Sequence, residues 1–234
     1  ITRNLGTINK MSFQYSKISP HSTYSPWNSD DYYLNTFNLA KDYTLVDNYR
    51  LFELYNLALQ SCDLEGDFLE VGVYKGGSSS IIQSALNKNQ SNKKFYIADT
   101  FNGVPKAGHE KDNQYKGGEH STSISYVQRL FSLLGFKSPD ILIGVFPDDH
   151  PNFNIEKLVF VHSDVDAYQS TKDIVEWCLP KLVIGGIIVF DDYGFPACQG
   201  VTEYVNCFML DKSNSTQFRF VHNLNGHAIL IKIR

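Results

Sequence analysis

Long apolar runs, abundant cysteine and concentrated positive charge are all missing from this sequence. Its apolar runs, such as residues 183–190, have the length of a buried strand and fall far short of the ~20 residues that cross a bilayer. We therefore expect a soluble protein without a membrane partner. A net charge of −4 and the lack of a basic tract disfavour nucleic acid as a partner.

Cysteine is scarce and scattered. The four cysteines, Cys62, Cys178, Cys198 and Cys207, include no C-x-x-C pair, which argues against a disulfide framework and against a zinc site. We expect them to be core thiols in a reducing, cytoplasmic compartment. Because the chain begins at Ile1 and no charged-then-apolar leader follows, we interpret the sequence as trimmed, with upstream targeting signals left open.

The sequence does contain enough apolar material for one large domain, with 234 residues of which 42% are apolar and 20% charged. Residues 1–43 are rich in Ser, Asn, Tyr and Thr and predict an N-terminal arm, a lid-like segment packed on the core. Within the arm, only residues 32–40 show helical spacing. Residues 44–234 predict the main domain. The aromatic residues of the arm favour self-association, so a homo-oligomer is expected.

From residue 66 onward, short apolar runs alternate with amphipathic segments, which is typical of a parallel sheet covered by helices on both faces. The predicted strands are residues 67–71, 94–99, 141–144, 158–162 and 187–191. The predicted helices are residues 44–62, capped by Thr44, then 78–86, 123–134, 170–182 and 200–210. These elements predict an α/β doubly wound fold.

The carboxy-terminal part of the pattern differs. Two strand-like runs, residues 218–222 and 228–233, flank an Asn225-Gly226 step that is a hairpin signal. A mostly parallel seven-stranded sheet that ends in an antiparallel hairpin is expected of a Rossmann-like class I methyltransferase and is unusual for a dehydrogenase.

A glycine-rich turn joins the first predicted strand to its helix, with the sequence E-V-G-V-Y-K-G-G-S over residues 70–78. Glycine allows the backbone to approach a ligand closely, and the helix amino terminus faces that ligand. The dinucleotide fingerprint requires glycine where Tyr74 stands, so a pyrophosphate turn is disfavoured. Glu70, two residues before Gly72, suits the positively charged amino acid portion of S-adenosylmethionine. The alternative is a tight turn without a ligand.

Asp99 ends the second predicted strand. A carboxylate there can accept hydrogen bonds from both hydroxyls of a ribose. Dehydrogenases place an acid at the same position, so Asp99 indicates a nucleoside ligand without deciding the reaction. The alternative is a surface aspartate at a strand end.

Four aspartates follow two strands that one helical crossover should make neighbours: Asp164, Asp166, Asp191 and Asp192. Like charges this close raise one another's pKa unless a cation compensates them. With oxygen ligands only, and no Cys or His nearby, the cluster predicts Mg²⁺, or Mn²⁺ or Ca²⁺, rather than zinc. Asp166, expected on the same side of an extended chain as Asp164, could take a proton from a hydroxyl. The alternative is that these acids cap helices and face solvent.

Blocks along most of the chain resemble the macrocin O-methyltransferase family, metal-dependent enzymes that methylate sugar hydroxyls of macrolides and other natural products. The matching blocks are Y-S-P-W at 24–27 with Asp30, Y-T-L-V-D at 43–47 with Arg50, L-E-V-G-V-Y-K-G-G at 69–77, D-T-F-N-G-V-P at 99–105, G-V-F-P-D at 144–148, D-V-D-A-Y-Q-S-T at 164–171, and G-G at 185–186 followed by D-D-Y at 191–193. Ala167, Gln169 and the Asp148-Asp149 pair depart from the family pattern, so the substrate side is matched less closely than the metal side.

This resemblance implies an S-adenosylmethionine-dependent O-methyltransferase whose acceptor is a hydroxyl of a sugar or glycosylated small molecule. It assigns the divalent metal to Asp164, Asp191 and Asp192, the general base to Asp166, and cofactor binding to Glu70 and Asp99. The expected cofactor site also includes Gly72, Tyr74, Ser78, Thr100, Phe146 and Asp164.

Other segments carry weaker signals. The long stretch 102–122 predicts a lid over the acceptor, and its histidines His109 and His120 are more often solvent-exposed loop residues than catalytic ones. Aromatic residues of the arm, Trp27, Tyr32 and Tyr33, are candidates for an apolar wall of the acceptor site, although such residues usually serve packing first. Arg50 is expected to anchor the arm.

Three other functions compete with methyl transfer. A Rossmann-type NAD-dependent oxidoreductase is disfavoured by Tyr74, the aspartate cluster and the terminal hairpin. A metal-dependent hydrolase using the same four acids leaves Glu70, Gly72 and Asp99 without a role. For a non-catalytic scaffold, the acidic cluster would be an unnecessary electrostatic cost.

Overall fold

The computed structural model describes residues 13–18, 21–108, 110–223 and 225–234. Its seven-stranded sheet has the order β3-β2-β1-β4-β5-β7-β6, with β1 to β5 parallel and β7 antiparallel to both of its neighbours. The strands are β1 (Asp67–Val71), β2 (Phe95–Asp99), β3 (Asp140–Ile143), β4 (Leu158–Ser163), β5 (Leu182–Phe190), β6 (Phe218–His222) and β7 (Ala228–Lys232). The predicted parallel sheet with a carboxy-terminal hairpin is confirmed.

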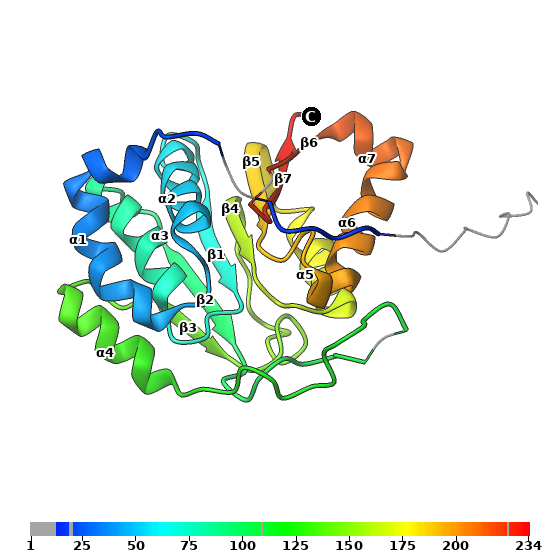
Figure 1. The fold of residues 1–234 in the computed structure, drawn as a ribbon, viewed down its shortest axis with the longest axis horizontal. Helices are drawn as coiled ribbons and strands as arrows, with labels where there is room; N and C mark the ends of the chain where they lie inside the picture. The colour runs from blue at the N-terminus through cyan, green and yellow to red at the C-terminus, as the bar shows by residue number, and fades with distance from the viewer. Residues whose placement is uncertain (1–12, 19–20, 109, 224) are drawn as a thin grey trace, which may run out of the picture.

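Helices cover both faces of this sheet (Figure 1). On one face lie α1 (Asp31–Ala40), α2 (Asn48–Ser61), α3 (Gly77–Lys88) and α4 (Ile124–Leu134), and on the other lie α5 (Tyr168–Cys178), α6 (Gln199–Leu210) and α7 (Lys212–Gln217). Short 3₁₀ turns are η1 (Pro26–Ser29), η2 (Lys41–Tyr43) and η3 (Pro196–Cys198). No helix among the described ranges has the length and apolar character that a membrane crossing needs.

The sheet separates two apolar cores, one on each face, because successive residues of a strand point to opposite faces. Phe68, Phe160 and Val189 pack under α2 and α3, whereas Leu69, Val161 and Ile188 pack under α5 and α6. Cys178 and Cys198 are buried free thiols, and Cys62 and Cys207 are partly buried.

Some element boundaries differ from the sequence prediction. Helix α2 begins after Asp47, whose carboxylate accepts hydrogen bonds from the backbone N–H groups of Tyr49 and Arg50, so Asp47 and not Thr44 is the N-cap. Helix α5 ends at Cys178, and β5 already begins at Leu182, because the apolar run continues through Gly185 and Gly186 as strand. The polar helix α7 was not predicted.

The described part of the arm packs on α2 and α3 mainly through aromatic side chains. Tyr33 is fully buried, and its hydroxyl donates to Asn48 Oδ1 at 2.7 Å. Trp27 packs edge-on against Tyr49, with ring centroids 5.1 Å apart. Trp27, Tyr32 and Tyr33 are absent from the lining of the main cavity. Trp27 and Tyr33 therefore serve packing, whereas Tyr32 is 39% exposed. Residues 1–12 of the predicted arm lie outside the described residues.

The strand register brings the predicted site residues to one edge. Val71 lies beside Ala98 on one side and Ser163 on the other, and Ser163 lies beside Phe190. The residues that follow these positions therefore emerge together at the carboxyl ends of the parallel strands, where open α/β sheets bind ligands.

Candidate active site

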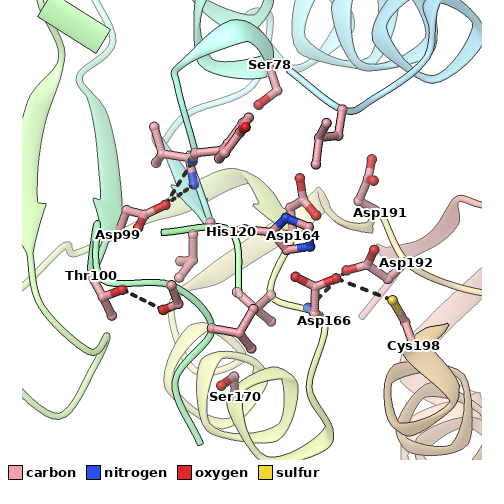
Figure 2. Close-up of a pocket in the computed structure, with 18 of the residues that line it drawn as sticks. Ser78, Asp99, Thr100, His120, Asp164, Asp166, Ser170, Asp191, Asp192 and Cys198 are labelled. Atoms are coloured by element: carbon pink, nitrogen blue, oxygen red, sulfur yellow. Dashed lines mark hydrogen bonds between the residues drawn. The ribbon is translucent and has the colours of Figure 1, made fainter. Parts of the chain in front are cut away.

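A cavity opens at this carboxyl edge, and Figure 2 shows the side chains that converge on it. Every predicted site residue except Glu70 lines the cavity: Gly72, Tyr74, Ser78, Asp99, Thr100, Phe146, Asp164, Asp166, Asp191 and Asp192. Helix α2 contributes Arg50, and the segment between β2 and α4 contributes Val104, Tyr115 and His120. The cavity thus joins the expected cofactor and metal regions in one space.

The glycine-rich turn leaves no room for a side chain at Gly72. Gly72 has φ +89°, and a Cβ added there would lie 1.6 Å from the backbone oxygen of Asp164. Its N–H donates to the carbonyl oxygen of Ala98 at 3.0 Å. The turn after β1 is therefore packed directly against the backbone that carries Asp164.

The carboxylate of Asp99 stabilises the same turn through hydrogen bonds. Its Oδ2 accepts hydrogen bonds from the backbone N–H groups of Val73 at 2.6 Å and Tyr74 at 2.9 Å, and its Oδ1 accepts one from Phe101 at 2.6 Å. Each carboxylate oxygen has more than one acceptor site. Asp99 can therefore hold the turn and still accept hydrogen bonds from a ligand in the cavity.

Glu70 does not reach the cavity. Its fully buried carboxylate accepts a hydrogen bond from the hydroxyl of Ser79, and its Oε1 lies 2.8 Å from His162 Nδ1. Glu70 thus lies in β1 beneath α3, apart from the other expected cofactor residues. Its contact with a cofactor stays a prediction.

Asp164, Asp191 and Asp192 each bring a carboxylate oxygen within 4.8 Å of the other two. Asp166 joins them through its backbone N–H, which donates to Asp192 Oδ2 at 3.0 Å. The expected extended chain through Asp166 is wrong: β4 ends at Ser163, and Asp166 has φ +59°, a left-handed conformation that non-glycine residues rarely adopt. A turn, and not strand alternation, brings Asp166 to its neighbours.

The carboxylates differ in electrostatic surroundings. Burial, followed by the charges of the neighbouring aspartates, raises the pKa of Asp164 and of Asp192 well above the ordinary value. Burial also raises the pKa of Asp166. Burial opposes the charge of Asp191 as well, but the nearby rings of His162 and His227 and the charge of Arg50 outweigh it and lower the pKa of Asp191. The protein therefore compensates the negative charge of the cluster mainly at Asp191.

Three cationic or hydrogen-bonding groups surround Asp191. Arg50 Nη1 donates to its Oδ2, and His227 Nε2 and His162 Nε2 lie 2.9 and 3.5 Å from its Oδ1. Arg50 thus serves the aspartate cluster and the α2 N-cap, where its Nε donates to Asp47 at 2.7 Å, and not mainly the arm. Neither histidine was predicted as a site residue, although Glu70 and His162 are register partners in β1 and β4.

The expectation that no Cys or His lies near the acids is also wrong. Cys198 Sγ donates to Asp166 Oδ1 at 3.4 Å, and burial raises the pKa of this thiol, which keeps it protonated. The Tyr115 hydroxyl lies 3.3 Å from His120 Nε2. Asp166 is therefore held by hydrogen bonds to Cys198 and to Asp192, which lie in two separate segments.

The segment between β2 and α4 (green in Figure 1) is fastened to helix α5 and to η3. Ser170 donates to the carbonyl oxygen of Pro105 at 3.2 Å, the Tyr168 N–H donates to Asp112 Oδ1 at 2.9 Å, and Asn113 donates to the carbonyl oxygen of Pro196 at 2.5 Å. This segment covers one side of the cavity. Of its two histidines, His120 is exposed and lines the cavity, whereas His109 lies outside the described residues.

The carboxylates fit a hard divalent cation. Three carboxylates within 4.8 Å, two of them with raised pKa values, form the oxygen-rich set that Mg²⁺ or Ca²⁺ prefers. The group His162, Asp191 and His227 is equally compact but suits a softer metal poorly, because both nitrogens of His227 already face carboxylates. The oxygen set is therefore the better cation site.

The family profile of the macrocin-O-methyltransferases matches residues 28–218. A mycinamicin III 3''-O-methyltransferase from Micromonospora griseorubida is 33% identical over 152 residues, covering 59% of this chain and 60% of that protein. An 8-demethyl-8-(2,3-dimethoxy-alpha-L-rhamnosyl)-tetracenomycin-C 4'-O-methyltransferase from Streptomyces olivaceus is 31% identical over 144 residues, covering 57% of this chain and 55% of that protein. The chain thus spans little more than half the length of these relatives.

Solved structures show the same fold. The O-methyltransferase NovP superposes with a TM-score of 0.71 at 22% identity, covering 82% of this chain and 83% of that one. The calicheamicin methyltransferase CalS11 gives a TM-score of 0.61 at 17% identity, covering 95% and 99%. The fold is that of a class I methyltransferase. Because the family match runs from the arm through the start of β6, the chain belongs to the macrocin-O-methyltransferase family.

Proposed function

We propose that this chain carries an S-adenosylmethionine-dependent, Mg²⁺-requiring O-methyltransferase activity toward a sugar hydroxyl of a small molecule. The observation that carries the proposal is the convergence of Asp164, Asp166, Asp191 and Asp192 in one cavity with the Gly72 turn. The family membership supports methyl transfer, and relatives are named for sugar O-methylation.

The chain's own residues suit a cofactor beside the turn. Gly72 keeps the turn free of side-chain atoms, Asp99 offers acceptor sites for ribose hydroxyls, and Tyr74, Ser78 and Phe146 line the adjoining walls. When bound, the cofactor supplies an electrophilic methyl group, and the divalent ion lowers the pKa of a coordinated hydroxyl. Asp164, Asp191 and Asp192 would hold that ion.

Asp166 is the proposed general base. Its burial raises its pKa and so makes its carboxylate a better proton acceptor, while Cys198 holds the side chain through a hydrogen bond. A base fixed in this way takes the proton of the acceptor hydroxyl as the oxygen reacts, which is typically worth 10²–10⁴ in rate. Ordering the reactants in one cavity contributes further acceleration.

The acceptor is proposed to lie under the segment between β2 and α4, against Val104, Tyr115 and His120. A sugar or glycoside hydroxyl is the proposed class, following the names of the relatives. A cytoplasmic location and self-association into a homo-oligomer belong to the same proposal, and light scattering of the purified protein tests the latter.

The test is a methyl-transfer screen with purified protein, S-adenosylmethionine, a panel of glycosides and either Mg²⁺ or EDTA, read by mass spectrometry. The expected result is a product heavier by one methyl group that forms with Mg²⁺ and not with EDTA. Calorimetric titration with S-adenosylhomocysteine and with NAD provides the control, and only the first should bind. Binding of NAD instead, or turnover that is indifferent to EDTA, contradicts the proposal.

A further inference from the structure

A buried bridge links helix α2 to Asp191 through the carboxy-terminal hairpin. His227 Nδ1 lies 2.5 Å from Glu53 Oε2, and His227 Nε2 lies 2.9 Å from Asp191 Oδ1. The His227 side chain is fully buried, whereas the Glu53 side chain is 28% exposed. One imidazole thus connects a carboxylate near the surface with a carboxylate of the metal cluster.

The sheet register explains how residues so distant in sequence meet. Strand β7 runs antiparallel to β5 and pairs Phe190 with Ala228, so the next residues beyond that pair, Asp191 and His227, lie opposite each other. Glu53 also accepts a hydrogen bond from the Asn223 side chain, and Asn223 Oδ1 accepts one from the His227 N–H at 3.2 Å. Helix α2 therefore fixes the hairpin turn and the histidine together.

This arrangement restrains the Asp191 carboxylate at both oxygens. His227 holds Oδ1 and Arg50 holds Oδ2, so the group cannot rotate without breaking a buried hydrogen bond. The other nearby histidine, His162, lies at 3.5 Å, and its Nε2 makes no hydrogen bond. His227 is consequently the histidine that orients Asp191.

We propose that His227, held by Glu53, is a positioning residue for Asp191 as a metal ligand. The inference rests on the proposed function, since it takes Asp191 to bind the divalent ion. Groups that hydrogen-bond to metal ligands orient them, and losing such a group typically weakens metal affinity 10–100-fold. Packing of the hairpin alone does not require this pair, because a buried ion bridge is often replaced by apolar residues without loss of stability.

The test uses His227→Gln and Glu53→Gln, with His222→Gln as the matched control. His222 lies in the same hairpin but is exposed, and its ring contacts Tyr193 and Phe220. Mn²⁺ affinity is measured by electron paramagnetic resonance, S-adenosylhomocysteine affinity by calorimetry, and thermal unfolding by circular dichroism. We expect Mn²⁺ to bind 10–100-fold more weakly to His227→Gln. A smaller loss is expected for Glu53→Gln, no change for the control, and unaltered S-adenosylhomocysteine affinity throughout.

Two other outcomes overturn the inference in different ways. If the unmodified protein binds Mn²⁺ and both variants bind it within twofold of that affinity, His227 and Glu53 have only a structural role. If the unmodified protein itself binds no Mn²⁺, the metal part of the proposed function fails, and the inference fails with it. Because Glu53 is partly exposed, Glu53→Gln keeps the test decisive should His227→Gln not fold.

Discussion

Arg50 and Asp191 form a buried ion pair although 141 residues separate them in the chain. The guanidinium also donates from Nε to Asp47 at 2.7 Å, so one side chain links the start of α2 to the end of β5. The nearby rings of His162 and His227, followed by the charge of Arg50, lower the pKa of Asp191, whereas the pKa values of Asp164 and Asp192 are raised. The protein thus supplies its own cation to part of the cluster.

Removing the Arg50 guanidinium should destabilise the folded protein. Arg50→Met leaves Asp191 buried without its nearest charge, and we expect the free energy of unfolding to fall by about 3–5 kcal/mol. Urea denaturation of the metal-free protein measures this loss. Lys88→Met, which removes the more exposed ion pair with Asp30, is the control and should cost no more than about 1 kcal/mol. Equal losses of unfolding free energy in the two variants would contradict the conclusion that Arg50 compensates the charge of Asp191.

Asp166→Asn should abolish proton removal while preserving binding. The amide has nearly the same shape but cannot act as a base at neutral pH, so kcat should fall by 10²–10⁴. The affinities for S-adenosylhomocysteine and Mn²⁺ should stay within a few-fold. Cys198→Ser, which retains a donor toward Asp166, should lower kcat far less. A kcat for Asp166→Asn within threefold of the original value would remove Asp166 from the mechanism.

Asp192→Asn should stabilise the metal-free protein while impairing its response to Mg²⁺. The raised pKa of Asp192 means that its charge opposes folding once the pH exceeds its ordinary value of 3.8. Replacing it with a neutral amide should add roughly 1 kcal/mol at pH 8, and the gain should shrink toward pH 4. Thermal unfolding with EDTA and with Mg²⁺ tests both parts. A variant less stable than the original in EDTA would show that the charge is compensated.

Gly72→Ala tests the close approach between the turn and Asp164. The added methyl group would overlap the Asp164 carbonyl at 1.6 Å, so a loss of more than about 3 kcal/mol and of cofactor binding is expected. Gly135→Ala is the matched control, because Gly135 also has a positive φ, +66°, but nothing lies within 4 Å of its Cβ position. It should cost about 1 kcal/mol. Comparable unfolding midpoints for the two variants would refute the packing argument.

The stability of the metal-free protein should fall as the pH rises. Burial disfavours the charged His162 ring, but the carboxylates of Asp191 and Glu70, which face its two ring nitrogens, raise its pKa to about 9 from the ordinary 6.5. Because the folded state favours the protonated ring, this contribution is complete below pH 6.5 and is lost as the pH passes through about 9.

Urea denaturation in EDTA at pH 6, 7.5 and 9.5 measures that decline for the original protein and for His162→Gln. The difference in unfolding free energy between the two proteins should be largest at the lowest pH. A difference that is independent of pH would show that His162 is neutral throughout the range.

Much of the fold follows from local sequence patterns. The strand at residues 67–71 was predicted at its observed bounds, and the hairpin at residues 218–233 was predicted from its apolar runs and its Asn-Gly step. Gly72, Asp99, Asp164 and Asp191 could be assigned to one edge, because parallel strands joined by helical crossovers share their carboxyl ends. These inferences need only the apolar periodicity, the turn residues and the rule that a helical crossover joins neighbouring parallel strands.

The partners of those residues could not be predicted in the same way. The separation of Glu70 from the cavity, the left-handed turn at Asp166 and the contacts of His227 and Arg50 with Asp191 all depend on register and on how α2 packs. A one-residue shift in register turns a side chain to the other face of a sheet. The sequence by itself determined which acids gather at the edge, and only the tertiary structure decided which of them has its charge balanced, because that balance is made by side chains 36 and 141 residues away from Asp191.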